Sequence, residues 1–217
     1  MLGGSDCSIH RTLANFLLPK GMKIICLLAV ATLCSAGLCP RVLAQETPLV
    51  VADFNKPGNL SNIDSEFGTW DKDPNDVTQS CRMKFVKDDA IGSKEGMSVR
   101  LEYDVDSPNP AYNGFWLKLD NADTSNYRIL HFYIRGDAET GFTSRIKIEI
   151  KDKKGGKDTH VVENISEKWQ KISIPLKPDR SIKKQLLEFT IVFDDVTSRP
   201  KKGAILIDEI EFSGARN

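Results

Sequence analysis

The sequence is poor in cysteine and histidine. Its 217 residues include five cysteines and three histidines, and four of the cysteines fall within the first 44 residues: Cys7, Cys26, Cys34 and Cys39. Cys81 is left without a partner in residues 45–217, so an internal disulfide is excluded there. No Cys/His spacing typical of a zinc site is present. The stability of this part of the chain must therefore come from a hydrophobic core.

Neither sign of charge is in excess, since 30 Lys and Arg stand against 30 Asp and Glu. Residues 1–44 contain four of the basic side chains and one of the acidic ones. The remaining 173 residues therefore carry 26 basic and 29 acidic side chains and a net charge of −3. This balance offers no electrostatic basis for binding nucleic acid.

Long hydrophobic runs are also scarce, and the clearest one spans residues 24–38 near the N-terminus. It follows Met22 and Lys23, is short for a membrane span, and precedes small residues at the −3 and −1 positions of Val42-Leu43-Ala44. This pattern predicts a secretory signal cleaved after Ala44, with a retained N-terminal anchor as the alternative. We therefore expect an N-terminal extension and signal at 1–44, starting at Met1 or Met22. The domain at 45–217 is expected to be secreted or periplasmic, with no membrane contact after cleavage.

From residue 49 onward, apolar and polar residues alternate with the period of β-strands. Turn-rich pieces such as "KDKKGGKD" separate the segments, and residues 179–188 could form a helical turn or two. The pattern predicts an all-β fold, an antiparallel β-sandwich or jelly roll. The candidate strands are 49–55, 82–87, 97–105, 114–120, 128–136, 144–152, 159–164, 169–176, 188–195 and 204–212.

Alternate positions of the central strands form two sets. One set is a core layer that includes Val99, Leu101, Phe115, Leu117, Phe132, Ile148 and Phe189. The other set mixes charged residues with aromatics: Arg100, Glu102, Asp104, Trp116, Lys118, His131, Tyr133, Arg135, Arg145, Lys147, Glu149, Lys151, Thr190 and Asp194. A sugar ring packs its C–H face on an aromatic plane and takes hydrogen bonds from such polar groups. The second set therefore predicts a glycan-binding face, unless its aromatics serve only strand pairing.

The order of the strands resembles that of a known family. The segments "LVVADFN", "YNGFWLKLD", "YRILHFYIRGD", "RIKIEIKDKKG", "EKWQKISIPL" and "GAILIDEIEF" follow one another as in family-eleven-like carbohydrate-binding modules. These modules share a galactose-binding-like jelly roll with the complex I intermediate-associated proteins. The resemblance covers residues 49–213. It implies a non-catalytic module that binds a polysaccharide or oligosaccharide, alone or beside a separately encoded glycan-active enzyme.

In that family the ligand lies across a concave sheet face. The tyrosine-rich cleft of the family is matched only in part, because the sequence has four tyrosines and Tyr103 falls on the core face. The resemblance implies that the ligand contacts are Trp116, His131, Tyr133, Arg135, Lys147 and Glu149 on the strands, with Trp70 and Tyr112 from the loops.

Relatives with this jelly roll often hold a structural calcium between the first and last strands. The matching carboxylates are Asp53 and Asp208, with Asn55 on the same face as Asp53. Because calcium takes six to eight oxygens, two carboxylates are only part of a site. The alternative is that both acids cap turns or pair with lysines.

Other functional classes are less well matched. His131, Tyr133, Arg135 and Lys147 are the residue types that a polysaccharide lyase uses to neutralise a uronate and remove a proton. A glycosidase dyad could be drawn from Glu102, Glu149 and Asp194. No lyase signature string is present, and the predicted signal argues against an organellar assembly factor that binds protein. The sequence therefore predicts a binding module rather than an enzyme.

Overall fold

The structure is a computed structural model that describes residues 47–56, 58–87, 89–92, 95–177 and 186–215. The predicted signal and cleavage site lie outside the described residues. So does most of the segment 179–188 that was predicted to form helical turns. Its described end, residues 186–188, belongs to a strand.

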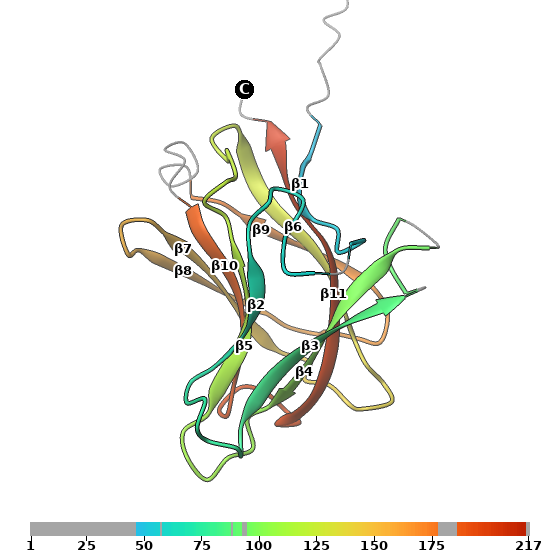
Figure 1. Ribbon diagram of the computed structural model, residues 1–217, viewed down its shortest axis with the longest axis vertical. Coiled ribbons are helices and arrows are strands. Elements are labelled where there is room, and N and C mark those ends of the chain that lie inside the picture. The colour runs from blue at the N-terminus through green and yellow to red at the C-terminus, as the bar shows by residue number, and fades with distance from the viewer. Residues whose placement is uncertain (1–46, 57, 88, 93–94, 178–185, 216–217) are drawn as a thin grey trace, which may run out of the picture. The chain divides into compact units, whose positions relative to one another are not determined.

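The described chain forms eleven β-strands and no helix, as the alternating pattern predicts (Figure 1). One strand was missed by the sequence pattern: "FGTWD" has no apolar–polar alternation, yet it pairs with the segment at 112–118. The strands are β1 (Leu49–Ala52), β2 (Phe67–Asp71), β3 (Ser80–Lys87), β4 (Met97–Asp104), β5 (Tyr112–Lys118), β6 (Tyr127–Gly136), β7 (Ile146–Asp152), β8 (Lys157–Val162), β9 (Gln170–Pro175), β10 (Leu186–Asp194) and β11 (Lys202–Ala215).

The strands make two antiparallel sheets that pack as a sandwich. One sheet has five strands in the order β2-β5-β10-β7-β8. The other has six, in the order β3-β4-β11-β6-β9 with β1 also paired to β11. Figure 1 shows β7, β8 and β10 in one layer and β6, β9 and β11 in the other. The predicted β-sandwich is confirmed.

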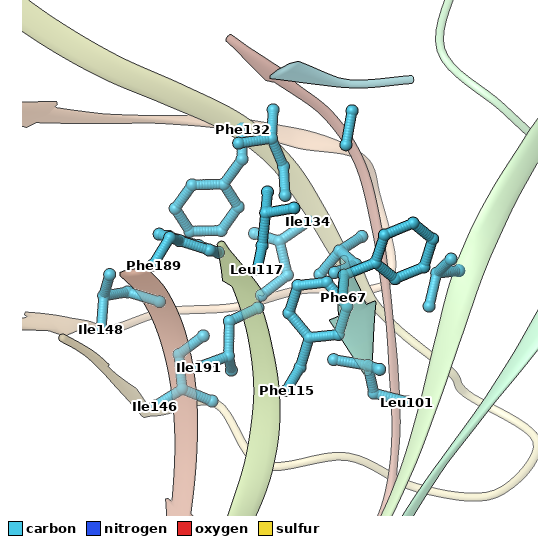
Figure 2. Packing of buried hydrophobic residues seen from close by; sticks show 14 of the residues in the cluster. Phe67, Leu101, Phe115, Leu117, Phe132, Ile134, Ile146, Ile148, Phe189 and Ile191 are labelled. Carbon is cyan, nitrogen blue, oxygen red and sulfur yellow. The ribbon is translucent and has the colours of Figure 1, made fainter. Parts of the chain in front are cut away.

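The core fills the space between the two sheets. Phe115 and Leu117 of β5 and Phe132 of β6 are fully buried, and the rings of Phe132 and Phe189 meet across the sandwich at 5.5 Å (Figure 2). Burying an aliphatic or aromatic side chain of this size contributes roughly 1.5–3 kcal/mol. These contacts join the two sheets. Because successive side chains of a strand point to opposite faces, the polar residues between the buried ones point outward.

Cys81 of β3 is buried and belongs to this core. Burial, helped by the negative charge of Asp71, raises the pKa of its thiol. The thiol therefore stays protonated and unreactive at neutral pH.

Within the described part of the chain, no helix has the length and apolar character needed to cross a membrane.

Candidate functional site

The structure divides the predicted polar face between two sheets. Trp116, Lys147 and Glu149 point outward from β5 and β7 of the five-stranded sheet. His131 and Tyr133 point outward from β6 of the six-stranded sheet, on the other side of the core. Grouping them on one face was wrong. The alternating pattern identifies the outward side of each strand but does not say which sheet the strand joins.

A groove of about 510 Å³ runs over the outer face of the five-stranded sheet. Four of the predicted ligand residues line it, and the other four lining residues were not among the predicted contacts. The eight lining residues are Trp70, Tyr112, Trp116, Lys118, Glu149, Lys151, Lys157 and Glu188. The groove therefore combines three aromatic rings with five charged side chains on one sheet.

The pairing of β2 with β5 positions the two tryptophans. Gly68 stands opposite Trp116, and Trp70 stands opposite Gly114, so each indole faces a residue without a side chain. A Cβ at position 68 would lie 3.2 Å from the Trp116 ring, which shows how closely the indole packs over that glycine. Each ring can thus lie on the sheet instead of standing away from it.

Tyr112 extends the aromatic part of the groove. Its ring meets the Trp70 ring edge-on at 5.7 Å, and it is 42% exposed. The ammonium group of Lys72 lies 5.2 Å from the centre of the tyrosine ring. A ligand therefore meets a partly exposed aromatic surface at this end.

Glu188 forms the polar floor of the groove. Its carboxylate accepts hydrogen bonds from Lys118 at 2.6 Å and Lys151 at 2.7 Å, and from the Thr190 hydroxyl at 3.2 Å. Burial alone would raise the pKa of Glu188, but the two lysines outweigh burial and hold it below the usual range. The floor is therefore a fixed anion with two partly exposed ammonium groups beside it.

The last predicted residue on this face, Lys147, lies outside the groove lining. Its ammonium group pairs with Asp194 at 2.9 Å. Burial raises the pKa of Asp194, but bonds from Thr197 and Lys147 outweigh it and lower the pKa overall. Lys147 therefore forms an ion pair between β7 and β10 beside the groove and does not line it.

Two of the four lining residues that were not predicted as contacts, Lys118 and Lys151, had already been placed on the mixed polar face by the alternating pattern. Lys118 lies two positions after Trp116, and Lys151 lies two positions after Glu149, so each shares an outward face with a predicted contact. Glu188 and Lys157 could not be found in this way. They join the groove only because β10 and β8 pair with β7.

The outer face of the six-stranded sheet is occupied by contacts within the protein. Both ring nitrogens of His131 are hydrogen-bonded to serine hydroxyls, Nδ1 to Ser173 at 2.8 Å and Nε2 to Ser213 at 2.7 Å. Burial, together with the nearby positive charge of Lys171, lowers the pKa of His131. The same ammonium group lies 5.7 Å from the centre of the Tyr133 ring. These groups are already engaged with their neighbours.

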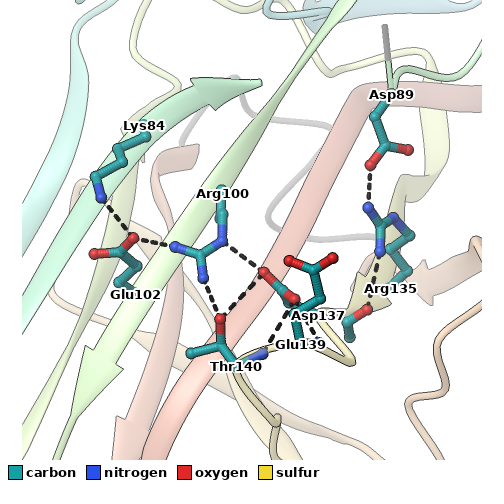
Figure 3. A network of polar contacts seen from close by, with 9 residues as sticks. Lys84, Asp89, Arg100, Glu102, Arg135, Asp137, Glu139 and Thr140 are labelled. Atoms are coloured by element: carbon teal, nitrogen blue, oxygen red, sulfur yellow. Dashed lines mark hydrogen bonds and ion pairs between the residues drawn. The ribbon is translucent and has the colours of Figure 1, made fainter. Parts of the chain in front are cut away.

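Arg135 on the same face is also engaged by neighbouring side chains. It forms an ion pair with Asp89 (Figure 3). Its guanidinium also lies 5.5 Å from the centre of the Trp169 ring. Nearby, Arg100 connects Glu102 with Asp137 in a second network. This face is a surface of paired charges, and neither arginine lines the groove of the five-stranded sheet.

The alternative catalytic groupings are therefore not assembled. His131, Tyr133 and Arg135 lie on the opposite sheet from Lys147, so they cannot act on one substrate group as a lyase would. Glu102 is likewise separated from Glu149 and Asp194. The latter two share a sheet, but each carboxylate is held by its own lysine.

The two predicted calcium ligands, Asp53 and Asp208, both accept hydrogen bonds from backbone N–H groups. Asp208 is fully buried on β11, and burial raises its pKa to about 7, with repulsion from Glu209 and Asp53 adding to the effect. Its oxygens accept hydrogen bonds from the backbone N–H groups of Ile91 and Glu209, and Asp53 caps a local turn. These bonds match the turn-capping alternative. Among the described residues, no group of three or more acidic, histidine or cysteine side chains could hold a metal ion.

A two-sheet antiparallel sandwich with an aromatic, hydrogen-bonding groove across one sheet is the architecture of a carbohydrate-binding module. Residues 60–214 match the family model of carbohydrate binding domain 30, and the chain belongs to this family. The likeness to carbohydrate-binding β-sandwich modules is confirmed, although the matching family model is number 30 and not 11. A search of curated proteins found no match.

Several solved structures share the fold. A family 11 carbohydrate-binding module of a cellulosomal cellulase from Clostridium thermocellum is 16% identical, with 78% of this chain and 95% of that chain covered and a TM-score of 0.53. A family 11 module from the same organism, in complex with a β-1,3-1,4-mixed-linked tetrasaccharide, is 17% identical, with 77% and 96% covered and a TM-score of 0.53. An exo-β-agarase is 9% identical, with 79% and 26% covered and a TM-score of 0.54. At these identities the likeness concerns the fold.

Proposed function

We propose that this carbohydrate-binding module is exported, non-catalytic, and binds an extended glycan in the groove of the five-stranded sheet. The observation that carries the proposal is the juxtaposition of Trp70, Tyr112 and Trp116 with the charged groups around Glu188. Aromatic planes suit the C–H faces of sugar rings, and carboxylate and ammonium groups suit their hydroxyls. The family 11 relative solved with a mixed-linked tetrasaccharide supports a chain of sugars as the ligand class.

The length of the groove also favours a chain of sugars. Its lining residues come from all five strands of the sheet. Five strands at a spacing of about 4.8 Å span roughly 19 Å. A single sugar would leave most of this surface uncovered. Because the surface is shallow and solvent-exposed, we expect dissociation constants on the order of micromolar to millimolar.

The absence of catalysis is supported by the dispersal of the candidate groups. The groove contains two carboxylates, Glu149 and Glu188, and both form salt bridges to lysines. A general acid needs a raised pKa, whereas the pKa of Glu188 is lowered. A module of this kind would hold a glycan alone or beside a separately encoded glycan-active enzyme.

The function is tested by affinity electrophoresis of the protein through gels that contain soluble polysaccharides. A β-1,3-1,4-mixed-linked glucan, a xylan and a galactan supply three backbones. Retardation by at least one of them, reversed by adding the free oligosaccharide, is the expected result. Unchanged migration in every gel would contradict glycan binding by this groove.

Export is a separate proposal, motivated by Lys23, the apolar run at 24–38 and the small residues before Gln45. We expect N-terminal sequencing of the protein recovered from its natural host to begin at Gln45. A mature chain that begins at Met1 or Met22 would overturn the predicted cleavage.

The structural calcium is likewise a proposal, and electrostatics supports it. Burial is the main cause of the raised pKa of Asp208, and repulsion from Glu209 and Asp53 adds to it; a cation near Asp208 would relieve that repulsion. Backbone carbonyls and water would have to complete the six to eight oxygen ligands. We expect the melting temperature to fall in excess chelator and to recover when calcium is added, because an ion bound only to the native state stabilises it.

The Asp208→Asn variant separates calcium from turn capping. It retains one carbonyl oxygen as an acceptor for the backbone N–H groups but removes the charge. If calcium is bound, the variant should lose the response to chelator and calcium. A parent protein whose melting temperature ignores the chelator would exclude a structural calcium.

A further inference from the structure

The charges on the outer face of the five-stranded sheet are distributed unevenly. One cross-strand row at one end of the groove contains Lys118, Glu188, Lys151 and Lys157 on β5, β10, β7 and β8. We call this row, together with the turn that joins β7 to β8, the lysine end. Three ammonium groups in the row surround a single carboxylate.

The turn adds to this excess of positive charge. It carries Lys153 and Lys154, which are both exposed. The two aspartates of the turn segment are buried: Asp152 accepts hydrogen bonds from the turn's own backbone, and Asp158 pairs with Lys177. The lysines of "KDKKGGKD" therefore face solvent while its acids are engaged within the fold.

The acids closest to this end only partly neutralise it. Glu188 is shared between Lys118 and Lys151, and Glu149, from the next row, pairs with Lys157 at 2.7 Å. Glu66 lies at the β2 side, where its carbonyl accepts a hydrogen bond from the Lys118 backbone. Asp152 in the turn adds a fourth carboxylate, because its backbone hydrogen bonds do not cancel its charge, and Asp158 is balanced by Lys177. Four carboxylates thus stand beside five lysines, which leaves a net positive charge.

The ammonium groups remain available to a ligand. The side chains of Lys118, Lys151 and Lys157 are 36%, 38% and 50% exposed, and each ammonium has three donors. Lys118 also lies 5.2 Å from the centre of the Trp116 ring. A sugar stacked on Trp116 would therefore place its substituents within the field of these lysines.

We propose that the lysine end selects glycans with negatively charged substituents, carboxylate or sulfate, over their neutral counterparts. This inference rests on the proposed function, because the charged sugar must lie in the same groove as Trp116. The lowered pKa of Glu188 supports it, since that carboxylate is already engaged by two lysines and offers little repulsion to a second anion. The aromatic rings hold the sugar backbone, and the lysines discriminate by charge.

The test compares polysaccharides that share a backbone and differ in charge. The pairs are hydroxyethyl cellulose with carboxymethyl cellulose, arabinoxylan with glucuronoxylan, and desulfated carrageenan with carrageenan. The full chain is measured by affinity electrophoresis at about 0.01 M salt, where the Debye length is near 30 Å, and at about 1 M, where it is near 3 Å. We expect the charged member of at least one pair to bind roughly tenfold more tightly at low salt and about equally at high salt.

Two variants assign the preference to this end of the sheet. The double variant Lys153→Gln/Lys154→Gln should reduce the charge preference by about two- to fivefold and leave binding of the neutral member unchanged. Lys168→Gln, an exposed lysine preceding β9 of the opposite sheet, is the matched control and should change nothing. Comparing the charge preference for the carboxylated polysaccharides with that for the sulfated one shows which anion the protein favours.

The outcomes separate the two proposals. If a neutral polysaccharide binds as well as its charged counterpart in every pair that binds, the selectivity is overturned and glycan binding stands. If the preference survives undiminished both in the double variant and in Lys151→Gln/Lys157→Gln, as it does in the Lys168 control, the lysine end is not its source. If no polysaccharide binds, both proposals fall.

Discussion

Replacing Trp116 with alanine is expected to weaken glycan binding by about 1–3 kcal/mol, or roughly 5- to 150-fold in dissociation constant. The indole lies over Gly68 at the centre of the groove, so its loss removes the plane on which a sugar ring would stack. Stability should fall by only about 0.5–1 kcal/mol, because the ring is half-buried on the outer face and outside the core. Affinity electrophoresis and urea unfolding measure the two effects separately.

A matched control lies directly before β9 of the other sheet. Trp169 is also half-buried, but its indole nitrogen donates a hydrogen bond to Asp89 at 3.1 Å and its ring contacts Arg135. Trp169→Ala should leave glycan binding unchanged. The groove assignment fails if Trp169→Ala weakens binding as much as Trp116→Ala does, or if the Trp116 variant binds every glycan as the parent does.

Truncating Phe115, the residue next to Trp116, is expected to lower stability and to leave glycan affinity nearly unchanged. Phe115→Ala should lower the free energy of unfolding by about 3–5 kcal/mol, because it opens a cavity in a packed core. The Phe115 side chain is fully buried, and its ring lies 6.2 Å from that of Phe54 and 5.9 Å from that of Phe67. Urea unfolding should show a lower midpoint with an unchanged slope.

The remaining folded Phe115→Ala protein should bind glycan with nearly the parent affinity, since Phe115 points away from the groove. Phe115→Leu, which keeps most of the apolar volume, should be destabilised by less than the alanine variant. Equal loss of stability in Phe115→Ala and Trp116→Ala would show that the two neighbours do not face opposite sides of the sheet.

The sequence was sufficient to predict the antiparallel sandwich and most of its strands, since β4, β6 and β7 alternate strictly between core and surface residues. It was insufficient for β2, whose "FGTWD" has three glycine or polar positions and no regular alternation. That segment is a strand because β5 pairs with it. Trp70 and Tyr112 were both expected to reach the groove from loops, but Trp70 reaches it from β2 and Tyr112 from the first residue of β5.

About half of the predicted ligand residues line the groove. Trp116 and Glu149 were identified correctly as outward-facing, and Trp70 and Tyr112 were placed near them by the resemblance. His131, Tyr133 and Arg135 satisfied the same sequence pattern but lie on the other sheet. Their role in glycan binding is not supported by their position, since hydrogen bonds, ion pairs and ring contacts already engage them.

By itself the sequence determined which side of each strand is apolar, because a strand alternates its side chains whatever its neighbours are. The core and the exposure of Trp116 follow from that local rule. Only the tertiary structure decided which strands share a sheet, and therefore which outward-facing residues lie on the same face. The sequence could not decide this, because both sheets of a sandwich impose the same two-residue period on their strands. Pairing of β10 with β5 and β7 brings Trp116, Glu188 and Glu149 together from distant segments, while pairing of β6 with β11 carries His131 to the opposite face.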